Sequence, residues 1–307
     1  MSIVDIPVES AGALQAGRRE VRGELLRELL RSPMFLIGAT ILLFWIVCAI
    51  FGPAIVPHDP LAQNLEGINQ APSSAHPFGT DQLGRDMLSR VIVGVRNVLI
   101  IAPLATLMAT VLGTALGLLM GYFRGLLDDA LGRVVEAFLA LPVVVTGVIA
   151  LATLGRTNGV LIVVIGILFT PLIARTVRAA VLLESELDYV AAARLRGEGS
   201  LYIMFVEILP NVLAPILVEF TVRLAYAIFA VLTLTFLGLG IQPPTADWAG
   251  DIAANFGVVP AGYWWEVTFA AVAIVTLAVS VTLISDSVQG VFESWAARST
   301  RRRARPR

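Results

Sequence analysis

The side chains that most often carry out chemistry are scarce in this sequence, and those present lack the spacing of a catalytic site. The two histidines, His58 and His76, lie in one polar segment and form no His-Glu-x-x-His zinc motif. The sequence holds no Gly-x-Ser-x-Gly nucleophile motif and no pair of aspartates within an apolar stretch. We therefore predict no catalytic residue, no metal site and no enzymatic activity for this chain.

The sequence also lacks the P-loop motif that binds nucleotide phosphates. That motif needs a lysine after its glycines to reach the phosphates, whereas all 22 basic residues here are arginine. If ATP drives this protein, another chain must bind it. The single cysteine, Cys48, excludes a disulfide framework and a cysteine metal cluster.

One pair of charges stands inside an apolar stretch. Glu219 and Arg223 are four residues apart, so they share a helix face in the order that favours pairing. An unpaired arginine at mid-membrane costs about 2.5–3.5 kcal/mol on insertion scales, which predicts mutual neutralisation. Intramembrane charges also mark transport pathways. Both a structural and a pathway-lining role stay open for this pair.

The elements that position these residues are membrane spans. Hydrophobic residues make up 57% of the chain and charged residues 15%, below the roughly 25% of a soluble domain. The apolar stretches approach the ~20 residues that cross a bilayer as a helix, and none alternates as a barrel strand does. The sequence thus predicts an all-α integral membrane protein of six transmembrane helices, within 34–56, 97–123, 137–155, 157–174, 212–240 and 267–285.

The distribution of arginine predicts the orientation and the division of the chain. With six spans, the termini and the loops 124–136 and 175–211 share one side and hold most arginines, which predicts cytoplasmic N- and C-termini. The first apolar run begins too late for a signal peptide. The net charge of −1 argues against nucleic acid, and the basic C-terminus suits anionic lipid. We expect an N-terminal tail at 1–33, a first helix plus outer segment at 34–94, a five-helix domain at 95–290 and an Arg-rich tail at 291–307.

The second span carries a ridge of small residues. They recur every four positions, a spacing that lets another helix approach closely. We predict a helix-packing role for this ridge, with a partner helix either in this chain or in another subunit. Its members are Ala105, Ala109, Gly113, Gly117, Gly121 and Gly125.

The largest inner loop, 175–211, has the pattern of a compact helical projection, which we call the knob. Residues 191–196 favour a helix, and Gly197 suits its C-cap. A second short helix is expected from Leu201 to Pro210. An ordinary charged inner loop is the alternative that composition alone leaves open.

Three motifs resemble those of a known family. Ala192 and Ala193, then Gly197, then Leu209-Pro210 resemble the coupling-loop signature of bacterial ABC-importer permeases. The segment 76–90 (His-Pro-Phe-Gly-Thr-Asp-Gln-Leu-Gly-Arg-Asp-Met-Leu-Ser-Arg) resembles the C-type subunit of dipeptide/oligopeptide/nickel permeases, as does 236–248 (Phe-Leu-Gly-Leu-Gly-Ile-Gln-Pro-Pro-Thr-Ala-Asp-Trp). The resemblance extends from about residue 34 to 290 and implies a type I ABC-importer permease fold.

The resemblance implies an assembly and the residues that serve it. This chain would be half of the translocation pathway, paired with a B-type permease, with ATP and Mg on two ATP-binding subunits and with an extracytoplasmic substrate-binding protein. It would be a multi-pass protein of the bacterial inner membrane that carries di- or oligopeptides and itself binds no cofactor. The ATPase-coupling residues carried over are Ala191, Ala192, Ala193, Arg194, Leu195, Arg196 and Gly197.

The coupling loop departs from the family pattern at its head. The usual glutamate is Ala191 here, Arg196 stands where an apolar residue is common, and Glu207 replaces a frequent isoleucine. We expect Asp188, with Glu186, to supply the lost polar contact to the ATPase.

The outer motif holds its own candidates. We expect residues 81–86 to form a short interfacial helix in which Gly84 permits close approach. Internal packing and contact with the delivery protein are both open roles for this motif. Its members are Gly79, Thr80, Asp81, Gly84, Arg85 and Asp86.

Three other functions remain open as alternatives to a peptide importer. A self-sufficient secondary transporter or channel would also be a helical bundle, and Glu219 and Arg223 would then be its first pathway residues. An importer of nickel or another small solute shares the same architecture. A membrane scaffold would need no defined cytoplasmic knob, so its loop would tolerate substitution.

Overall fold

The computed structural model describes residues 27–303, with side chains through residue 294. The described part is helical, and its one extended pairing is an isolated bridge between Thr80 and Asp86. The all-α prediction is therefore confirmed. Most of the expected N-terminal tail and residues 304–307 lie outside the described residues, as do the side chains of the Arg-rich segment.

Five long helices have the length and apolarity to cross a membrane. The charged ends that the sequence assigned to loops or tails belong to the helices in three cases. The second span starts at Met87, the fourth continues to Glu184, and the last continues to Arg303, past the boundary expected between residues 290 and 291. The expected boundary between residues 94 and 95 therefore falls inside a helix. The long helices are α2 (Pro33–Ile55), α3 (Met87–Phe123), α6 (Asn158–Glu184), α9 (Leu209–Phe236) and α11 (Trp265–Arg303).

The third span differs from its prediction. Instead of one straight helix, α4 (Gly125–Leu139) and α5 (Val143–Leu154) meet at an angle of 88°. Pro142 is the N-cap of α5, and a proline has no N–H with which to continue α4. Residues 27–303 thus contain six spans only if this bent pair counts as one.

The ridge on α3 packs against α6, so its partner helix lies in this chain. A Cβ on Gly113, Gly117 or Gly121 would lie 2.7 Å from Ile173, Val177 or Val181, respectively. Only glycine allows this approach. The prediction was wrong for Gly125, which begins α4 with φ +59° and has nothing within 4 Å of its Cβ position.

The second short helix of the inner loop does not end at Pro210. Helix α8 (Ser200–Tyr202) leads into a π-helical segment, η2 (Ile203–Ile208), and then into α9 without a break. Pro210 lies directly after the π-helical segment, where the regular α-helical hydrogen-bond pattern is already interrupted and the missing N–H of a proline is accommodated. Sequence reasoning took a proline inside a continuous helix for a terminator.

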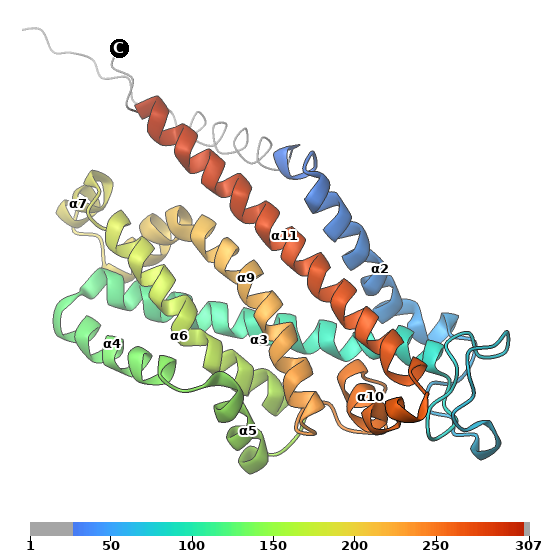
Figure 1. Ribbon diagram of the computed structural model, residues 1–307. Coiled ribbons are helices and arrows are strands. Elements are labelled where there is room, and N and C mark those ends of the chain that lie inside the picture. The colour runs from blue at the N-terminus through green and yellow to red at the C-terminus, as the bar shows by residue number, and fades with distance from the viewer. Residues whose placement is uncertain (1–26, 304–307) are drawn as a thin grey trace, which may run out of the picture.

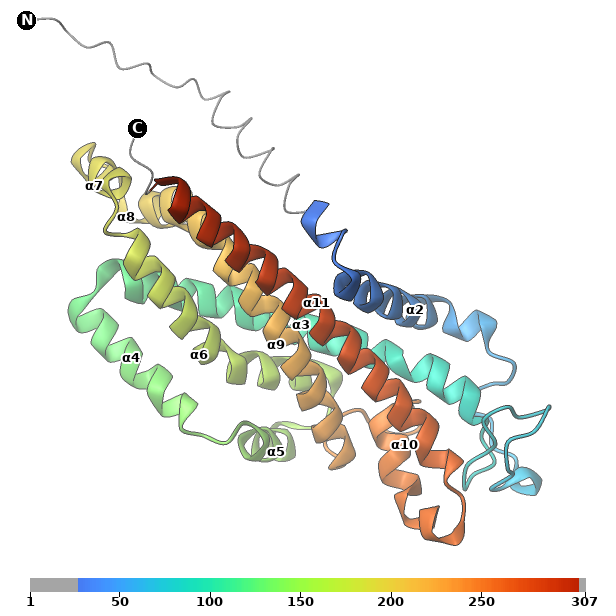
Figure 2. The same ribbon diagram turned by 45° about the horizontal axis from the view of Figure 1, so that its top comes forward.

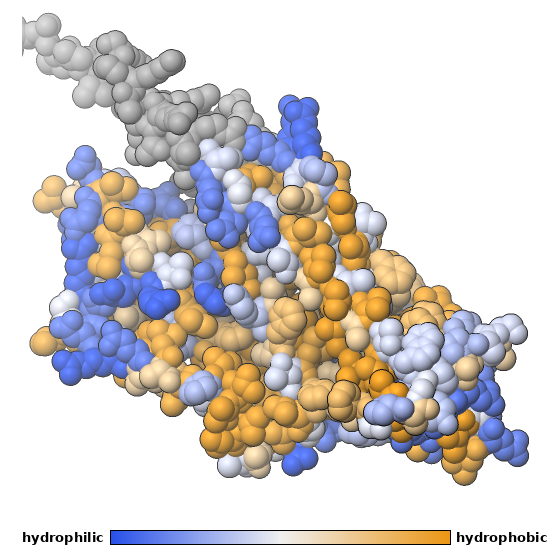
Figure 3. Space-filling model, viewed as in Figure 1, coloured by the Kyte–Doolittle hydropathy of each residue, from blue (hydrophilic) through white to orange (hydrophobic). Residues whose placement is uncertain are grey.

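The helices place two polar regions at opposite ends of the molecule (Figure 1). Helix α7 (Asp188–Leu195) lies at the end where α2 begins and α11 finishes, whereas the segment 57–86 and α10 (Trp248–Asn255) lie at the other end (Figure 2). Between these two ends, hydrophobic side chains cover α2, α9 and α11 (Figure 3). We call these the inner end and the outer end.

Candidate functional site

The knob at the inner end is α7 with the turn that follows it. Leu187 precedes the helix, Val190 and Ala193 are buried against the body of the protein, and the remaining face is exposed. The predicted helix is confirmed, although it begins three residues earlier than the range 191–196 and has Arg196 as its C-cap.

Gly197 closes α7 in a Schellman motif. Its φ is +77°, and its N–H donates to Arg194 O at 3.0 Å while the N–H of Glu198 donates to Ala193 O at 3.2 Å. A residue with a Cβ is strained at this φ. Nothing lies within 4 Å of a Cβ placed there, so glycine is required by the backbone and not by crowding.

Tyr189 fixes the knob to the adjoining spans. Its hydroxyl donates to Glu184 Oε1 at 3.0 Å and accepts from Asn211 Nδ2 at 3.1 Å, which links α7 to α6 and α9. Burial raises the pKa of Tyr189 to about 12, so the hydroxyl remains a donor at neutral pH. Arg194 also lies over the Tyr122 ring of α3, 5.1 Å from its centroid. Motion of α7 is thereby connected to three spans.

The outward face of the knob is apolar as well as charged. The Leu195 side chain is 90% exposed, and Ala191, Ala192 and Asp188 are exposed beside it. Glu186 forms an ion pair with Arg124, and Arg196 pairs with Glu198 and Glu207. Of the two acids expected to contact an ATPase, Asp188 is thus the one without an ion pair in the described structure.

Glu219 and Arg223 form the expected pair within α9. Arg223 Nε donates to Glu219 Oε1 at 2.6 Å, and the guanidinium lies 5.4 Å from the ring centroid of Tyr226. The Glu219 side chain is 11% exposed and that of Arg223 18%. Both charges are neutralised and largely buried within this chain, next to the exposed Tyr226.

The outer motif forms a buried turn and not the expected helix. Asp81 accepts hydrogen bonds from the N–H groups of Leu83 and Arg85 and pairs with the Arg85 guanidinium, so the chain doubles back before α3. Gly84, at φ +70°, packs directly on the carbonyl of Asn64, as the expected close approach requires. Gly79 is crowded by the Trp265 ring, whose indole N–H donates to Thr80 O at 3.1 Å.

A second arginine joins this turn to the distant α10. Arg90 is 2% exposed and donates to Asp251 through Nε at 2.9 Å and Nη2 at 2.5 Å. Trp248 adds a hydrogen bond from its indole N–H to Val91 O at 2.8 Å. Sequence reasoning missed Asp251, because 161 residues separate Arg90 from this partner and no spacing rule connects them.

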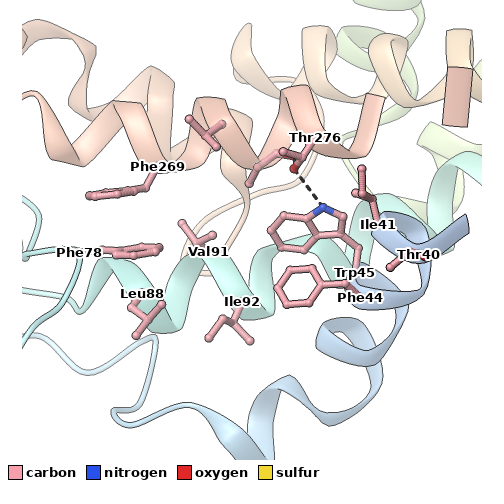
Figure 4. Close-up of a pocket in the computed structure, with 12 residues that line it drawn as sticks. Thr40, Ile41, Phe44, Trp45, Phe78, Leu88, Val91, Ile92, Phe269 and Thr276 are labelled. Carbon is pink, nitrogen blue, oxygen red and sulfur yellow. Dashed lines mark hydrogen bonds between the residues drawn. The ribbon is translucent and has the colours of Figure 1, made fainter. Parts of the chain in front are cut away.

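An apolar pocket of about 490 Å³ lies between α2, α3 and α11 (Figure 4). Phe78 and Phe269 stack at one end of it, 3.9 Å apart, and the Trp45 indole donates to the Thr276 hydroxyl at 3.1 Å. No charged side chain lines the pocket. It therefore lacks the groups that would hold the charged termini of a peptide.

These features match proteins of known class. Residues 113–298 fit the model for the binding-protein-dependent transport system inner membrane component, and residues 22–72 fit the N-terminal TM domain of oligopeptide transport permease C. The chain belongs to this inner-membrane permease family. It is a permease subunit of an ABC importer, and ATP is hydrolysed on partner subunits of such importers.

Curated relatives agree with the family. A putative peptide transport system permease protein of Brucella suis is 37% identical over 87% of this chain and 90% of its own length. The dipeptide transport system permease protein DppC of Bacillus subtilis is 34% identical over 87% of this chain and 83% of its own length, and the Escherichia coli DppC is 35% identical over 86% and 89%.

A solved structure supports the fold. The MetNI methionine ABC transporter in an inward-facing conformation superposes with a TM-score of 0.55, covering 67% of this chain and 97% of that chain at 20% identity. The resemblance noted from the sequence is thus confirmed for the family, the permease fold and the inner-membrane location. Importers of this class work with ATPase, permease and substrate-binding partners.

Proposed function

We propose that this chain is the C-type half of a heterodimeric permease that imports di- or oligopeptides. Its partners are a B-type permease, two ATP-binding subunits and an extracytoplasmic binding protein that delivers the peptide. The observation that carries the proposal is the knob at the inner end: a capped helix with an exposed apolar tip, tied to three spans. The peptide cargo is supported by the names of the relatives.

In this mechanism the chain converts closure of the ATPases into movement of its spans. The knob docks on the ATPase pair through Leu195 and its neighbours, and Tyr189 and Arg194 transmit its displacement to α6, α9 and α3. Coupling requires that the inward and outward states bind the ATPase dimer unequally. The inner end, where α2 begins and α11 finishes, accordingly faces the cytoplasm.

A glycine pair tests the coupling role. Gly197→Pro removes the N–H donated to Arg194 and cannot adopt φ +77°, whereas Gly199 has φ −69° and open space, so Gly199→Ala is a matched control. We expect Gly197→Pro and Gly197→Asp to abolish peptide uptake with normal amounts of protein in the membrane. Gly199→Ala retains uptake. Normal transport by Gly197→Pro would remove the coupling assignment.

The polar anchor of the knob is Asp188. It begins α7 and is exposed, and its charge favours a basic groove on the ATPase in place of the glutamate replaced by Ala191. Asp188→Arg is expected to lower co-purification of the ATPases, with Asp286→Arg on α11 as a control. Equal recovery of ATPase with both variants would contradict this contact.

The Glu219–Arg223 pair is proposed to face the pathway shared with the B-type permease. Charges at membrane depth face a bundle interior or a water-filled path, and here Tyr226 beside them is exposed. The exchanged pair Glu219→Arg/Arg223→Glu preserves mutual neutralisation. Loss of transport in a stable, assembled exchanged pair supports the pathway role, whereas full transport indicates a structural pair.

Purification of the native complex tests the assembly and the cargo together. Affinity isolation of the tagged chain should recover a second permease and P-loop ATPases, and reconstituted vesicles should take up a labelled dipeptide with ATP and the binding protein. A single species that transports without ATP would indicate a secondary transporter. ATP-driven uptake of nickel but not peptide would overturn the cargo.

A further inference from the structure

We infer that the outer end holds a site for a divalent transition-metal ion of the zinc type, formed by His58, His76 and Asp86. The inference contradicts the expectation from sequence that the chain has no metal site. It does not rest on the proposed cargo. The three ligands come from separate points of the chain: just after α2, within the outer segment, and at the N-cap of α3.

The ligand atoms already lie close together. Asp86 Oδ1 is 2.8 Å from His76 Nδ1 and 3.8 Å from His58 Nδ1, and one ligand atom from each residue falls within 4.8 Å of the others. The centroids of the two imidazole rings are 4.7 Å apart, and the ring planes are tilted by 35°. Ligands at about 2.0–2.1 Å from a tetrahedral zinc are on the order of 3.3 Å apart, so binding would change the separations between these ligand atoms by at most about 1.5 Å, within the reach of side-chain rotation.

The carboxylate is oriented by hydrogen bonds to its other oxygen. Asp86 Oδ2 accepts from the Ser89 N–H at 2.8 Å and from the Ser89 hydroxyl at 2.6 Å, which leaves Oδ1 directed at the histidines. Such support of a ligand is typical of metal sites and raises affinity by fixing its geometry. Asp86 is 1% exposed in its side chain, so it is held without competition from bulk water.

The backbone carrying each histidine is fixed as well. The N–H of His58 donates to Ser89 Oγ at 3.3 Å, and Arg90 donates to the carbonyl of Pro60 at 3.0 Å. The carbonyl of His76 accepts from the N–H groups of Gly79 and Ser73. The three ligands therefore sit on a pre-formed frame anchored in the first turn of α3.

The donor set defines the class of metal. Two imidazoles and one carboxylate suit zinc and its neighbours, whereas a calcium site is built from oxygen donors. The His58 side chain is 43% exposed and that of His76 20%, so solvent reaches the fourth coordination position. A bound ion would staple the chain that follows α2 to the start of α3.

The test uses the assembled transporter purified with a tag that contains no histidine. After equilibration with micromolar zinc chloride and removal of free metal, wild type should retain one zinc per chain more than His58→Ala. His58 is exposed, so this variant keeps the fold, and Gln63→Ala in the same exposed segment is the control. Cobalt(II) loaded into wild type should give the visible spectrum of a tetrahedral site, absent from His58→Ala and His76→Ala.

Two results would overturn the inference. One is equal zinc content in wild type, His58→Ala and His76→Ala, which assigns any bound zinc to other chains. The other is retention of no zinc by wild type, which reduces the cluster to a hydrogen bond between His76 and Asp86. Zinc-dependent protection of the segment 57–86 from protease in wild type, lost in His58→Ala, would support the staple.

Discussion

The outer and inner ends of this permease differ in how completely their surfaces are covered within the chain. At the outer end, Arg90, Asp251, Asp81 and Arg85 are almost fully buried and pair with one another. At the inner end, α7 buries only its inward face and leaves Leu195 90% exposed. A surface completed within one chain provides a rigid frame, whereas an incomplete apolar surface is typical of a docking site for another subunit. This difference is consistent with the proposed roles, a frame at the outer end and ATPase coupling at the inner end.

The largest expected effect comes from breaking the outer frame. Arg90→Met leaves Asp251 as an unpaired buried charge, which costs about 3–5 kcal/mol. We expect little folded protein, measured as monodisperse material after detergent extraction. The double variant Arg90→Met/Asp251→Leu removes both charges and should recover part of the loss. If the double variant yields no more folded protein than Arg90→Met, the ion pair between Arg90 and Asp251 does not stabilise the outer end.

A pH-dependent effect of somewhat smaller size is expected at Asp247. Burial raises the pKa of Asp247 to about 6, opposed only in part by the Gly250 N–H, and its Oδ2 has no hydrogen-bond partner. Between about pH 4 and 6 the folded state holds a proton that the unfolded state has lost, so stability falls as the pH rises through this window, by at most about 1.4 kcal/mol per unit.

Asp247→Asn removes this ionisation but keeps an oxygen to accept from Gly250. Thermal unfolding in nanodiscs should show the variant more stable than wild type above pH 6 and less dependent on pH below it. An unchanged pH profile would place the titration elsewhere. Asp247 is therefore an unfavourable buried carboxylate within the outer end, as is Glu266, whose two carboxylate oxygens are buried without a hydrogen-bond partner.

At the inner end the expected loss is in association and not in folding. Burying a leucine contributes about 1.5–3 kcal/mol, so Leu195→Asp should weaken binding of the ATPase subunits by roughly 10- to 100-fold. Unfolding of the isolated chain should not change. Leu65→Asp, which alters a 74% exposed leucine at the outer end, is the control and should leave ATPase binding intact. Equal losses from both variants would erase the distinction between the ends.

The smallest effect is expected at the α3–α6 contact that joins the two ends. A Cβ on Gly117 would lie 2.7 Å from Val177, and overpacking costs about 1–3 kcal/mol, offset by up to about 1 kcal/mol of helix propensity. Gly117→Ala should thus lower the unfolding temperature slightly. Gly290→Ala on α11, with nothing within 4 Å, should leave it equal or raise it. Equal shifts would mean that the two helices separate easily.

Sequence reasoning succeeded where local patterns decide the structure. Charge-free length predicted the long helices, and Gly197 predicted the end of α7, because a left-handed C-cap has a residue preference of its own. Four-residue spacing predicted the packing role of Gly113, Gly117 and Gly121. It failed at Gly125, since the same spacing continues past the end of α3, where the chain turns.

The sequence alone thus determined the broad character of the protein: an all-helical membrane permease that lacks a P-loop and has a glycine-capped helix at its inner end. Tertiary structure alone decided which distant groups meet. It paired Arg90 with Asp251, bent the third span at Pro142, and brought His58 and His76 to Asp86. The physical reason is that helix length and caps depend on neighbours in sequence, whereas buried ion pairs and ligand clusters depend on how separate elements pack.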